Sequence, residues 1–257
     1  MNPIVAGFIA SLLAGLATSV GALPVLLPIN LTKRVQSILL GFGGGVMLAA
    51  SAFSLIVPGT EAAITQGASQ IQAALIMSVG VLLGAVFLLL THKYLPHEHF
   101  FKGPEGVYSQ NLKRIWLFII AITIHNFPEG LAVGVNFGTG NFTESIPIAV
   151  GIGLQNIPEG LVVAVSLVSQ KYAASYAVGV SLLTGLVEPI GGLIGAAVVA
   201  VAQPILPLGM AFAAGAMLFV ISGEIIPESH NQGQEQEATI GVMLGFVVMM
   251  LLDIGLA

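Results

Sequence analysis

Two similar polar motifs interrupt long apolar stretches of this chain. The first is HNFPEG at residues 125–130, and the second is QNIPEG at residues 155–160. Each motif brings a carboxylate into a segment with the composition of a membrane helix, where an acidic residue costs about 2.5 to 3.5 kcal/mol on insertion scales. Because residues of this kind are rare in membranes unless they serve a function, the pair indicates a functional site.

The spacing within the motifs predicts that their polar side chains act together. His125 and Glu129 are four residues apart, so on a helix they share one face and could bind one cation together. Gln155 and Glu159 repeat this spacing in the next apolar segment. Consecutive membrane-spanning helices run antiparallel, so we expect the two motifs to face each other near the middle of the membrane, as in the inverted repeat of a transporter.

The charge of the motifs predicts a metal ion. Two carboxylates that face each other in a membrane would repel, or one would have to bind a proton. The apolar segments contain no lysine or arginine that could pair with Glu129 and Glu159, so a divalent metal ion is the simplest partner. Glu188, in the middle of the sixth apolar segment, would add a third carboxylate. With no cysteine in the chain, the ligands must be imidazole, carboxylate, amide, thioether or backbone oxygen.

Other polar residues near the motifs are further candidates. Every acid of the predicted site has a proline beside it, and a proline frees the backbone carbonyl oxygen four residues earlier, which is a hard ligand. The amides of Asn126, Gln155 and Asn156 could ligate the metal or form hydrogen bonds between helices. Met47 could be a thioether ligand or part of the core. Glu224 and Asp253 lie toward the ends of apolar segments, where they could line a pathway or simply be solvated.

The composition is that of a polytopic membrane protein. Of 257 residues, 56% are hydrophobic and 7% are charged. Only helices and closed barrels satisfy the backbone in lipid, and continuous rather than alternating apolarity favours helices. We therefore expect an all-α fold with eight transmembrane helices in a single domain, residues 1–257, and a first helix that is not cleaved. The apolar segments lie at roughly 3–29, 35–57, 71–91, 115–137, 146–169, 176–202, 208–227 and 238–256.

The loops predict the orientation. All seven basic residues fall in the loops after the first, third and fifth segments, which the positive-inside rule makes cytoplasmic, with both termini outside. Two cytoplasmic loops also carry groups that could bind cations loosely, although solvated linkers are the alternative. The first holds His92, His97, Glu98 and His99, the second holds Glu228, His230, Glu235 and Glu237, and neither has the spacing of a structural zinc site.

The paired motifs and the eight segments resemble the ZIP family of divalent-metal transporters, in particular its bacterial GufA-type branch. The resemblance implies a binuclear metal site in the middle of the membrane. One metal would bind His125, Glu129, Gln155, Glu159 and Met47, and the other Asn126, Glu129, Asn156, Glu159 and Glu188. The chain departs from the family pattern at its two amides, because many members have histidine at position 155 and some have aspartate at position 156.

The resemblance also implies the activity and the assembly. Members carry zinc, and often iron, cadmium, manganese or cobalt, across the bacterial cytoplasmic (inner) membrane into the cytoplasm, usually as homodimers in the lipid bilayer. Helices one, four, five and six resemble a mobile unit that slides against helices two, three, seven and eight. Apart from the resemblance, Glu224, Asp253 and His92 are candidates for lining the pathway. The metal is then the transported substrate, and neither an organic cofactor nor a nucleic acid partner is expected.

Two other functions remain open on the sequence. An intramembrane di-metal enzyme could use the same carboxylates, but such bundles characteristically carry Glu-x-x-His pairs, which this chain lacks together with the HExxH motif. A proton-coupled carrier of an organic solute would keep the carboxylates but would lack a buried basic residue to recognise an anion. Inward transport of Zn²⁺ or a similar ion is the predicted function, with modest selectivity because the ligands are mostly oxygens.

Overall fold

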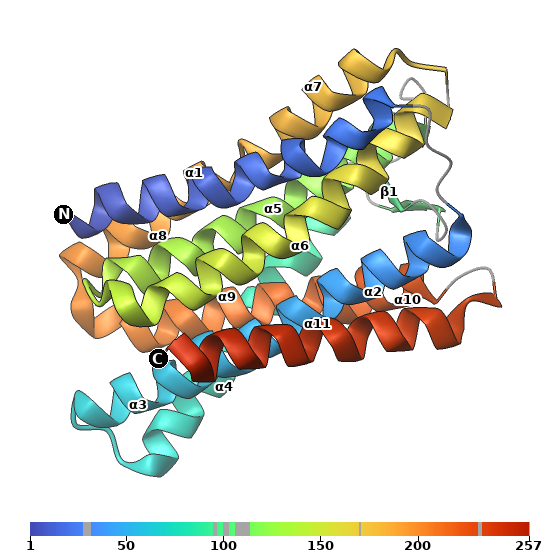
Figure 1. Ribbon diagram of the computed structural model, residues 1–257. Coiled ribbons are helices and arrows are strands. Elements are labelled where there is room, and N and C mark those ends of the chain that lie inside the picture. The colour runs from blue at the N-terminus through green and yellow to red at the C-terminus, as the bar shows by residue number, and fades with distance from the viewer. Residues whose placement is uncertain are drawn as a thin grey trace.

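The structure, a computed structural model, describes residues 1–27, 32–94, 97–99, 103–105, 114–169, 171–230 and 233–256. Long helices lie side by side, with both termini at one end of the molecule (Figure 1). Within the described residues, seven helical segments are long and apolar enough to cross a membrane, and α5 (Arg114–Gly138), of 25 residues, provides the eighth span that the sequence predicts. The predicted helical, polytopic fold is thus confirmed.

The elements follow one another along the chain in spans that match the predicted segments. The first span is α1 (Pro3–Ala22) with η1 (Leu23–Leu26), the second is α2 (Lys33–Ala49), η2 (Ala50–Ile56) and α3 (Val57–Thr65), and the third is α4 (Gln70–Tyr94). The strands β1 (His97–His99) and β2 (Gly103–Glu105) precede α5, which is followed by α6 (Phe142–Ser169). The sixth span is α7 (Ala174–Gly185) with α8 (Glu188–Val201). The seventh is η3 (Gln203–Ile205), α9 (Leu206–Val220), η4 (Ile221–Ile225) and α10 (Ile226–Ser229), and the eighth is α11 (Glu235–Leu256).

Three of the eight spans are interrupted, which the apolar pattern does not predict. The segments η2 and η4 are π-helical, and each is followed two residues later by a proline, Pro58 or Pro227. A proline has no N–H to donate to the α-helical ladder, and π-helical segments often occur at functional sites. The sixth span is broken by a turn at residues 186–187, so that Glu188 begins α8.

The loop after α4 contains a short hairpin, which the sequence does not predict. Its strands β1 and β2 form a two-stranded antiparallel sheet in which His97 is paired with Glu105, and β1 lies beside α5. The side chains of His97, Glu98 and His99 lie outside the described residues, so their role in metal binding stays a prediction.

The helices form two bundles, each held together by glycines at close helix contacts. The first bundle contains α1, α5, α6, α7 and α8, and the second contains α2, α4, α9 and α11 (Figure 1). In the first, a Cβ at Gly160 would collide with the carbonyl of Thr18, and in the second, a Cβ at Gly45 would collide with the carbonyl of Val242. Between the bundles, Gly151 meets the side chain of Met249 rather than a backbone. Close contacts between backbones therefore hold the helices of each bundle together, whereas at Gly151 the two bundles meet through a side chain.

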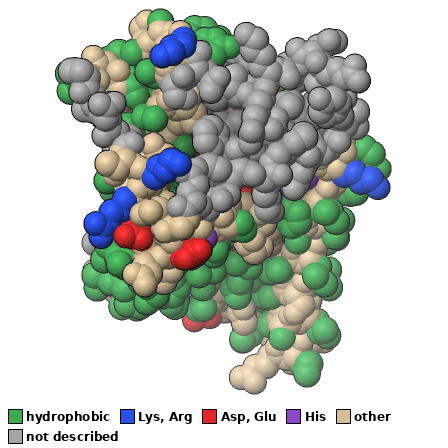
Figure 2. All heavy atoms as spheres, turned by 90° about the vertical axis from the view of Figure 1, so that its right-hand side faces the viewer, with side chains coloured by type: hydrophobic (Ala, Val, Ile, Leu, Met, Phe, Trp, Pro, Cys, Tyr) green, Lys and Arg blue, Asp and Glu red, His purple; other side chains and the backbone are tan. Residues whose placement is uncertain are grey.

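The surface fits a bilayer. Apolar side chains such as Leu82 on α4 and Leu251 on α11 are 64% and 63% exposed. Figure 2 looks onto the end of the molecule opposite the termini, where Lys and Arg side chains lie around the rim and hydrophobic side chains cover the flanks below. The basic side chains that the structure describes are all exposed: Lys33, Arg34, Lys93 and Lys171.

Candidate metal-binding site

Three carboxylates lie buried in the first bundle. Glu129 on α5 and Glu188 on α8 are 1% and 0% exposed, and Glu159 on α6 is also buried. They are close enough for Glu129 to act electrostatically on Glu159, and for both to act on Glu188. No lysine or arginine is buried within the part of the chain that the structure describes. The site thus brings together three carboxyl groups without a buried basic side chain, and a bound cation would stabilise their ionised forms.

Buried amides surround these carboxylates. Gln155 Nε2 donates a hydrogen bond of 2.8 Å to Asn156 Oδ1, and Asn156 Nδ2 donates to Glu188 Oε1 at 2.6 Å and to the carbonyl of Ala14 at 2.8 Å. Asn126 is fully buried, and its side-chain amide has no hydrogen-bond partner among the described residues. Glu129 Oε2, Glu159 Oε1 and Glu188 Oε2 are also buried without a hydrogen-bond partner among the described residues. Buried polar atoms nearly always have a partner, so this set of oxygens is suited to bind a cation.

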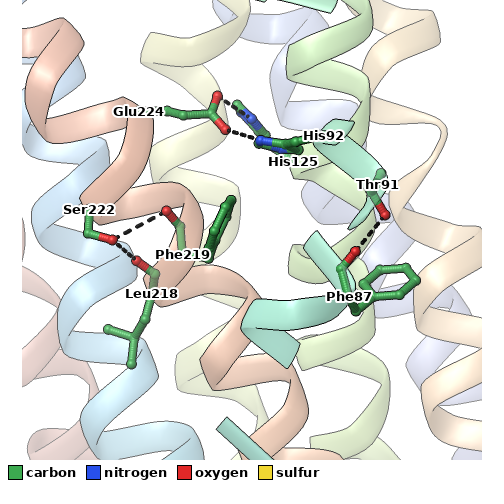
Figure 3. A network of polar contacts seen from close by, with 8 residues as sticks. All are labelled: Phe87, Thr91, His92, His125, Leu218, Phe219, Ser222 and Glu224. Atoms are coloured by element: carbon green, nitrogen blue, oxygen red, sulfur yellow. Dashed lines mark hydrogen bonds and ion pairs between the residues drawn. The ribbon is translucent and has the colours of Figure 1, made fainter. Parts of the chain in front are cut away.

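A second polar cluster joins the two bundles. His125 Nε2 on α5 lies 2.6 Å from Glu224 Oε2 on η4, and His92 Nδ1 on α4 lies 3.2 Å from Glu224 Oε1. The Glu224 carboxylate points toward both imidazoles (Figure 3). All three side chains are buried, and one candidate ligand atom from each lies within 4.8 Å of the others. Two imidazoles and a carboxylate are typical zinc ligands, and three protein ligands leave a coordination position open. We call these residues the inner cluster.

The inner cluster differs from the predicted arrangement in three respects. The sequence groups His125 with Glu129, Gln155 and Glu159, whereas the structure directs Nε2 of His125 to Glu224, which belongs to the other bundle. The placement of His92 in a loop is wrong, because α4 continues through Tyr94 and buries His92 to 5% exposure. Nor is Glu224 a solvated residue at a helix end, since it is 3% exposed.

Met47 and Gln155 come from helices of different bundles. Met47 is 1% exposed within the main apolar core. One turn earlier on α2, Gly43 faces Gln155, whose Oε1 would lie 3.4 Å from a Cβ at this glycine. The second bundle therefore approaches the central amides through α2, and ligation by Met47 stays a prediction.

Asp253 lies in a cavity at the end of the molecule that carries the termini. Ser54 Oγ donates a hydrogen bond of 2.6 Å to Asp253 Oδ1. The cavity has a volume of about 280 Å³ and is also lined by Glu61, Glu144 and Asn136. We call it the outer cavity. Sequence reasoning named Asp253 but missed Ser54, Glu61 and Glu144 as its neighbours, since nothing in the sequence brings these segments together.

An apolar layer separates the outer cavity from the central carboxylates. Along α6, Ser145 and Pro147 line the cavity, and Gln155 lies at the centre; between them, Ile148 and Ile152 are fully buried. On the other side of this layer, Gln155 and Glu159 border a narrow cavity of about 20 Å³ lined by apolar side chains of α2, α5 and α6. The central residues therefore border a small cavity, and two buried isoleucines lie between them and the outer cavity along α6.

Around the loop between α10 and α11, two of the groups that could bind cations have protein partners. Glu237 pairs with Arg34 at 3.1 Å, and His230 Nε2 lies 3.2 Å from Thr239 Oγ1. The side chain of Glu228 lies outside the described residues. For Glu237 and His230, these contacts agree with a structural role in joining α10 and α11 to α2.

Comparison with known proteins supplies the family. The model of the family described as ZIP Zinc transporter matches residues 102–253, which contain both motifs and Glu188. The chain belongs to the ZIP family. It is 49% identical to the zinc transporter GufA of Myxococcus xanthus over 98% of this chain and 99% of that protein. It is 43% identical to the zinc transporter ZIPB of Bordetella bronchiseptica, over 93% of this chain and 78% of that protein. The zinc transporter ZIP11 of Bos taurus is 34% identical, over 93% of this chain and 94% of that protein.

These similarities confirm the resemblance to the GufA-type branch of the ZIP family. A ZIP protein is a multi-pass membrane protein, which agrees with the helices described above.

Proposed function

We propose that this ZIP protein carries Zn²⁺, or a similar divalent ion such as Fe²⁺, Cd²⁺, Mn²⁺ or Co²⁺, into the cytoplasm. The observation that carries the proposal is the group of buried carboxylates in the first bundle, Glu129, Glu159 and Glu188, each with an oxygen that has no partner among the described residues. The names of the relatives, all zinc transporters, support the same class of substrate. Membrane carboxylates without a basic partner are best explained by a cation.

The pathway begins at the outer cavity. Its carboxylates, Glu61, Glu144 and Asp253, attract cations from the side of the termini. The apolar layer formed by Ile148 and Ile152 separates this cavity from the central carboxylates in the present state. On the opposite side, the cation passes from the centre to the inner cluster, where His92, His125 and Glu224 offer nitrogen and oxygen ligands.

Movement between the two bundles would open the pathway to each side in turn. His125 belongs to the first bundle, whereas His92 and Glu224 belong to the second, so the contact between His125 and Glu224 must break if the bundles slide. Close backbone contacts hold each bundle together, while side chains form the interface between them. This arrangement supports the predicted sliding of helices one, four, five and six against the other four.

The proposed orientation and assembly are those that the sequence predicts. Exposed lysines and arginines at the end opposite the termini support a cytoplasmic location for that end, with both termini outside the cytoplasmic membrane. A homodimer remains a prediction from the resemblance. Neither an intramembrane enzyme nor a carrier of organic solutes is favoured by any feature of the described residues.

Zinc flux into proteoliposomes tests the proposal. Glu159→Gln removes one central carboxylate charge and should lower the rate by about tenfold or more, because even partners outside the ligand shell cost about 10- to 100-fold in metal affinity. Glu235→Gln, at an exposed position in the first turn of α11, is the matched control and should transport like the parent. A Glu159→Gln protein that transports Zn²⁺ as fast as the parent would refute the proposal.

A further inference from the structure

Asn156 links the central carboxylates to the rest of their bundle. Its Nδ2 donates one hydrogen bond to the carbonyl of Ala14 on α1 at 2.8 Å and another to Glu188 Oε1 at 2.6 Å. Its Oδ1 accepts a hydrogen bond of 2.8 Å from Gln155 Nε2. The side chain is 0% exposed. Both N–H groups and the oxygen of this amide are therefore engaged with protein atoms.

The carbonyl of Ala14 determines which way the amide faces. A backbone carbonyl only accepts hydrogen bonds, and so does an ionised carboxylate. If the Asn156 amide were turned over, its oxygen would face the Ala14 carbonyl and the Glu188 carboxylate, and both hydrogen bonds would be lost. The nitrogen therefore faces Glu188, and the Asn156 oxygen is not directed at a cation that Glu188 binds.

The hydrogen bond from Asn156 also sets the orientation of Glu188. It occupies Oε1 and leaves Oε2, which has no partner among the described residues. Glu129 Oε2, Glu159 Oε1 and Asn126 Oδ1 are likewise buried and unpartnered in this part of the structure. These atoms, from α5, α6 and α8, form an oxygen ligand set that is complete without residue 156.

We propose that Asn156 is a positioning residue for Glu188 and not a metal ligand. This inference rests on the function proposed above and goes beyond it, because the binuclear arrangement implied by the resemblance uses residue 156 as a ligand. In this chain the N–H of the amide approaches Glu188 where a second cation would have to lie. One divalent cation then binds oxygens of Asn126, Glu129, Glu159 and Glu188, and Asn156 acts on it only through Glu188.

A double-mutant cycle separates positioning from ligation. Zn²⁺ binding to the purified full-length protein is measured by titration calorimetry in a Glu224→Ala background, so that the inner cluster does not contribute. Asn156→Ala should weaken binding by about 10- to 100-fold, as expected for a residue that orients a ligand. Glu188→Gln should weaken it at least as much. The double variant should bind as Glu188→Gln does, within about twofold, because Asn156 has nothing left to position.

Ser181→Ala is the control for a general structural effect. Ser181 is fully buried, and its Oγ donates a 3.2 Å hydrogen bond from α7 to the carbonyl of Gly160 on α6. Its loss should lower the melting temperature without changing Zn²⁺ affinity. If Asn156→Ala does not fold, Asn156→Ser takes its place in the cycle.

Three results would count against the inference. Losses that multiply in the double variant would show that Asn156 binds the metal independently. A loss of affinity in Ser181→Ala as large as that in Asn156→Ala would show that the effect is structural. Unchanged affinity in Glu188→Gln would instead overturn the metal-binding role of Glu188, and with it part of the proposed function.

Discussion

The contact between the His125 imidazole and the Glu224 carboxylate should hold the two bundles in the state described here. His125 Nε2 and Glu224 Oε2 are 2.6 Å apart, and the side chains are 4% and 3% exposed, so solvent weakens the interaction little. At the strength of a hydrogen bond to a charged group, such a contact contributes about 1.5 to 3 kcal/mol. If Glu224→Ala removes this contact, and the opposite state lacks it, the equilibrium should shift toward the opposite state by about 10- to 150-fold, at 1.4 kcal/mol per factor of ten.

The absence of native cysteines makes this shift measurable. A single cysteine introduced at Ile152, which is 0% exposed in the apolar layer, can be reached from the outer cavity only when that layer opens. We expect a membrane-impermeant maleimide added from outside, in the presence of a chelator, to label Ile152→Cys faster in the Glu224→Ala background. The labelling rate should rise by about the factor given above until the open state dominates.

Ser222→Ala provides the matched control, because Ser222 lies in the same π-helical segment but donates to Leu218 in its own helix (Figure 3). Its labelling rate should equal that of the parent. The same rate in the Glu224→Ala background as in the parent would refute the reasoning, since the contact would then contribute nothing to holding the bundles together.

Two further predictions concern packing and cation capture. Gly160→Ala places a methyl group against the carbonyl of Thr18 and should destabilise the protein by about 1 to 3 kcal/mol, which lowers the melting temperature by roughly 2 to 4 °C per kcal/mol. Gly179→Ala is the control and should leave the melting temperature unchanged, because nothing lies within 4 Å of a Cβ at this position. Equal melting curves for the two variants would contradict the proposed close packing. Asp253→Asn should raise the apparent KM for Zn²⁺ flux while leaving the maximal rate unchanged, because it lowers the negative charge of the outer cavity. The effect should shrink at high ionic strength, and a lower maximal rate at unchanged KM would argue against a capture role.

The spans and the buried acids could be predicted from the sequence, because both depend on composition along the chain. An uncharged run of membrane length becomes a helix wherever it lies, and an acid within it must be buried or paired. The positions at which the helical spans are interrupted could not be predicted from the prolines. Pro128 and Pro158 lie inside uninterrupted helices, whereas Pro58 and Pro227 follow π-helical segments. The response to a proline depends on which neighbours can satisfy the freed backbone groups, and these neighbours are tertiary.

The partners of the amides were beyond sequence reasoning for a related reason. Asn156 is fixed by the carbonyl of Ala14, 142 residues away, and a backbone carbonyl has no signature in a sequence. His92 shows that the end of a helix is also difficult to predict from the sequence. Its polar neighbours suggested a loop, but a helix can continue into polar sequence when a neighbouring helix of its own bundle covers it, as Glu224 and Phe219 cover this imidazole.

The position of His125 explains how the two clusters can be connected. Glu129, Glu159 and Glu188 all belong to the first bundle, so in the proposed mechanism a cation that they bind would move with that bundle. His92 and Glu224 belong to the second bundle and would stay behind. The i, i+4 spacing places His125 on the helical face of Glu129, while its Nε2 contacts Glu224 across the interface. In the proposed transport, His125 would therefore link the ligands of the first bundle to those of the second when the bundles meet as they do here.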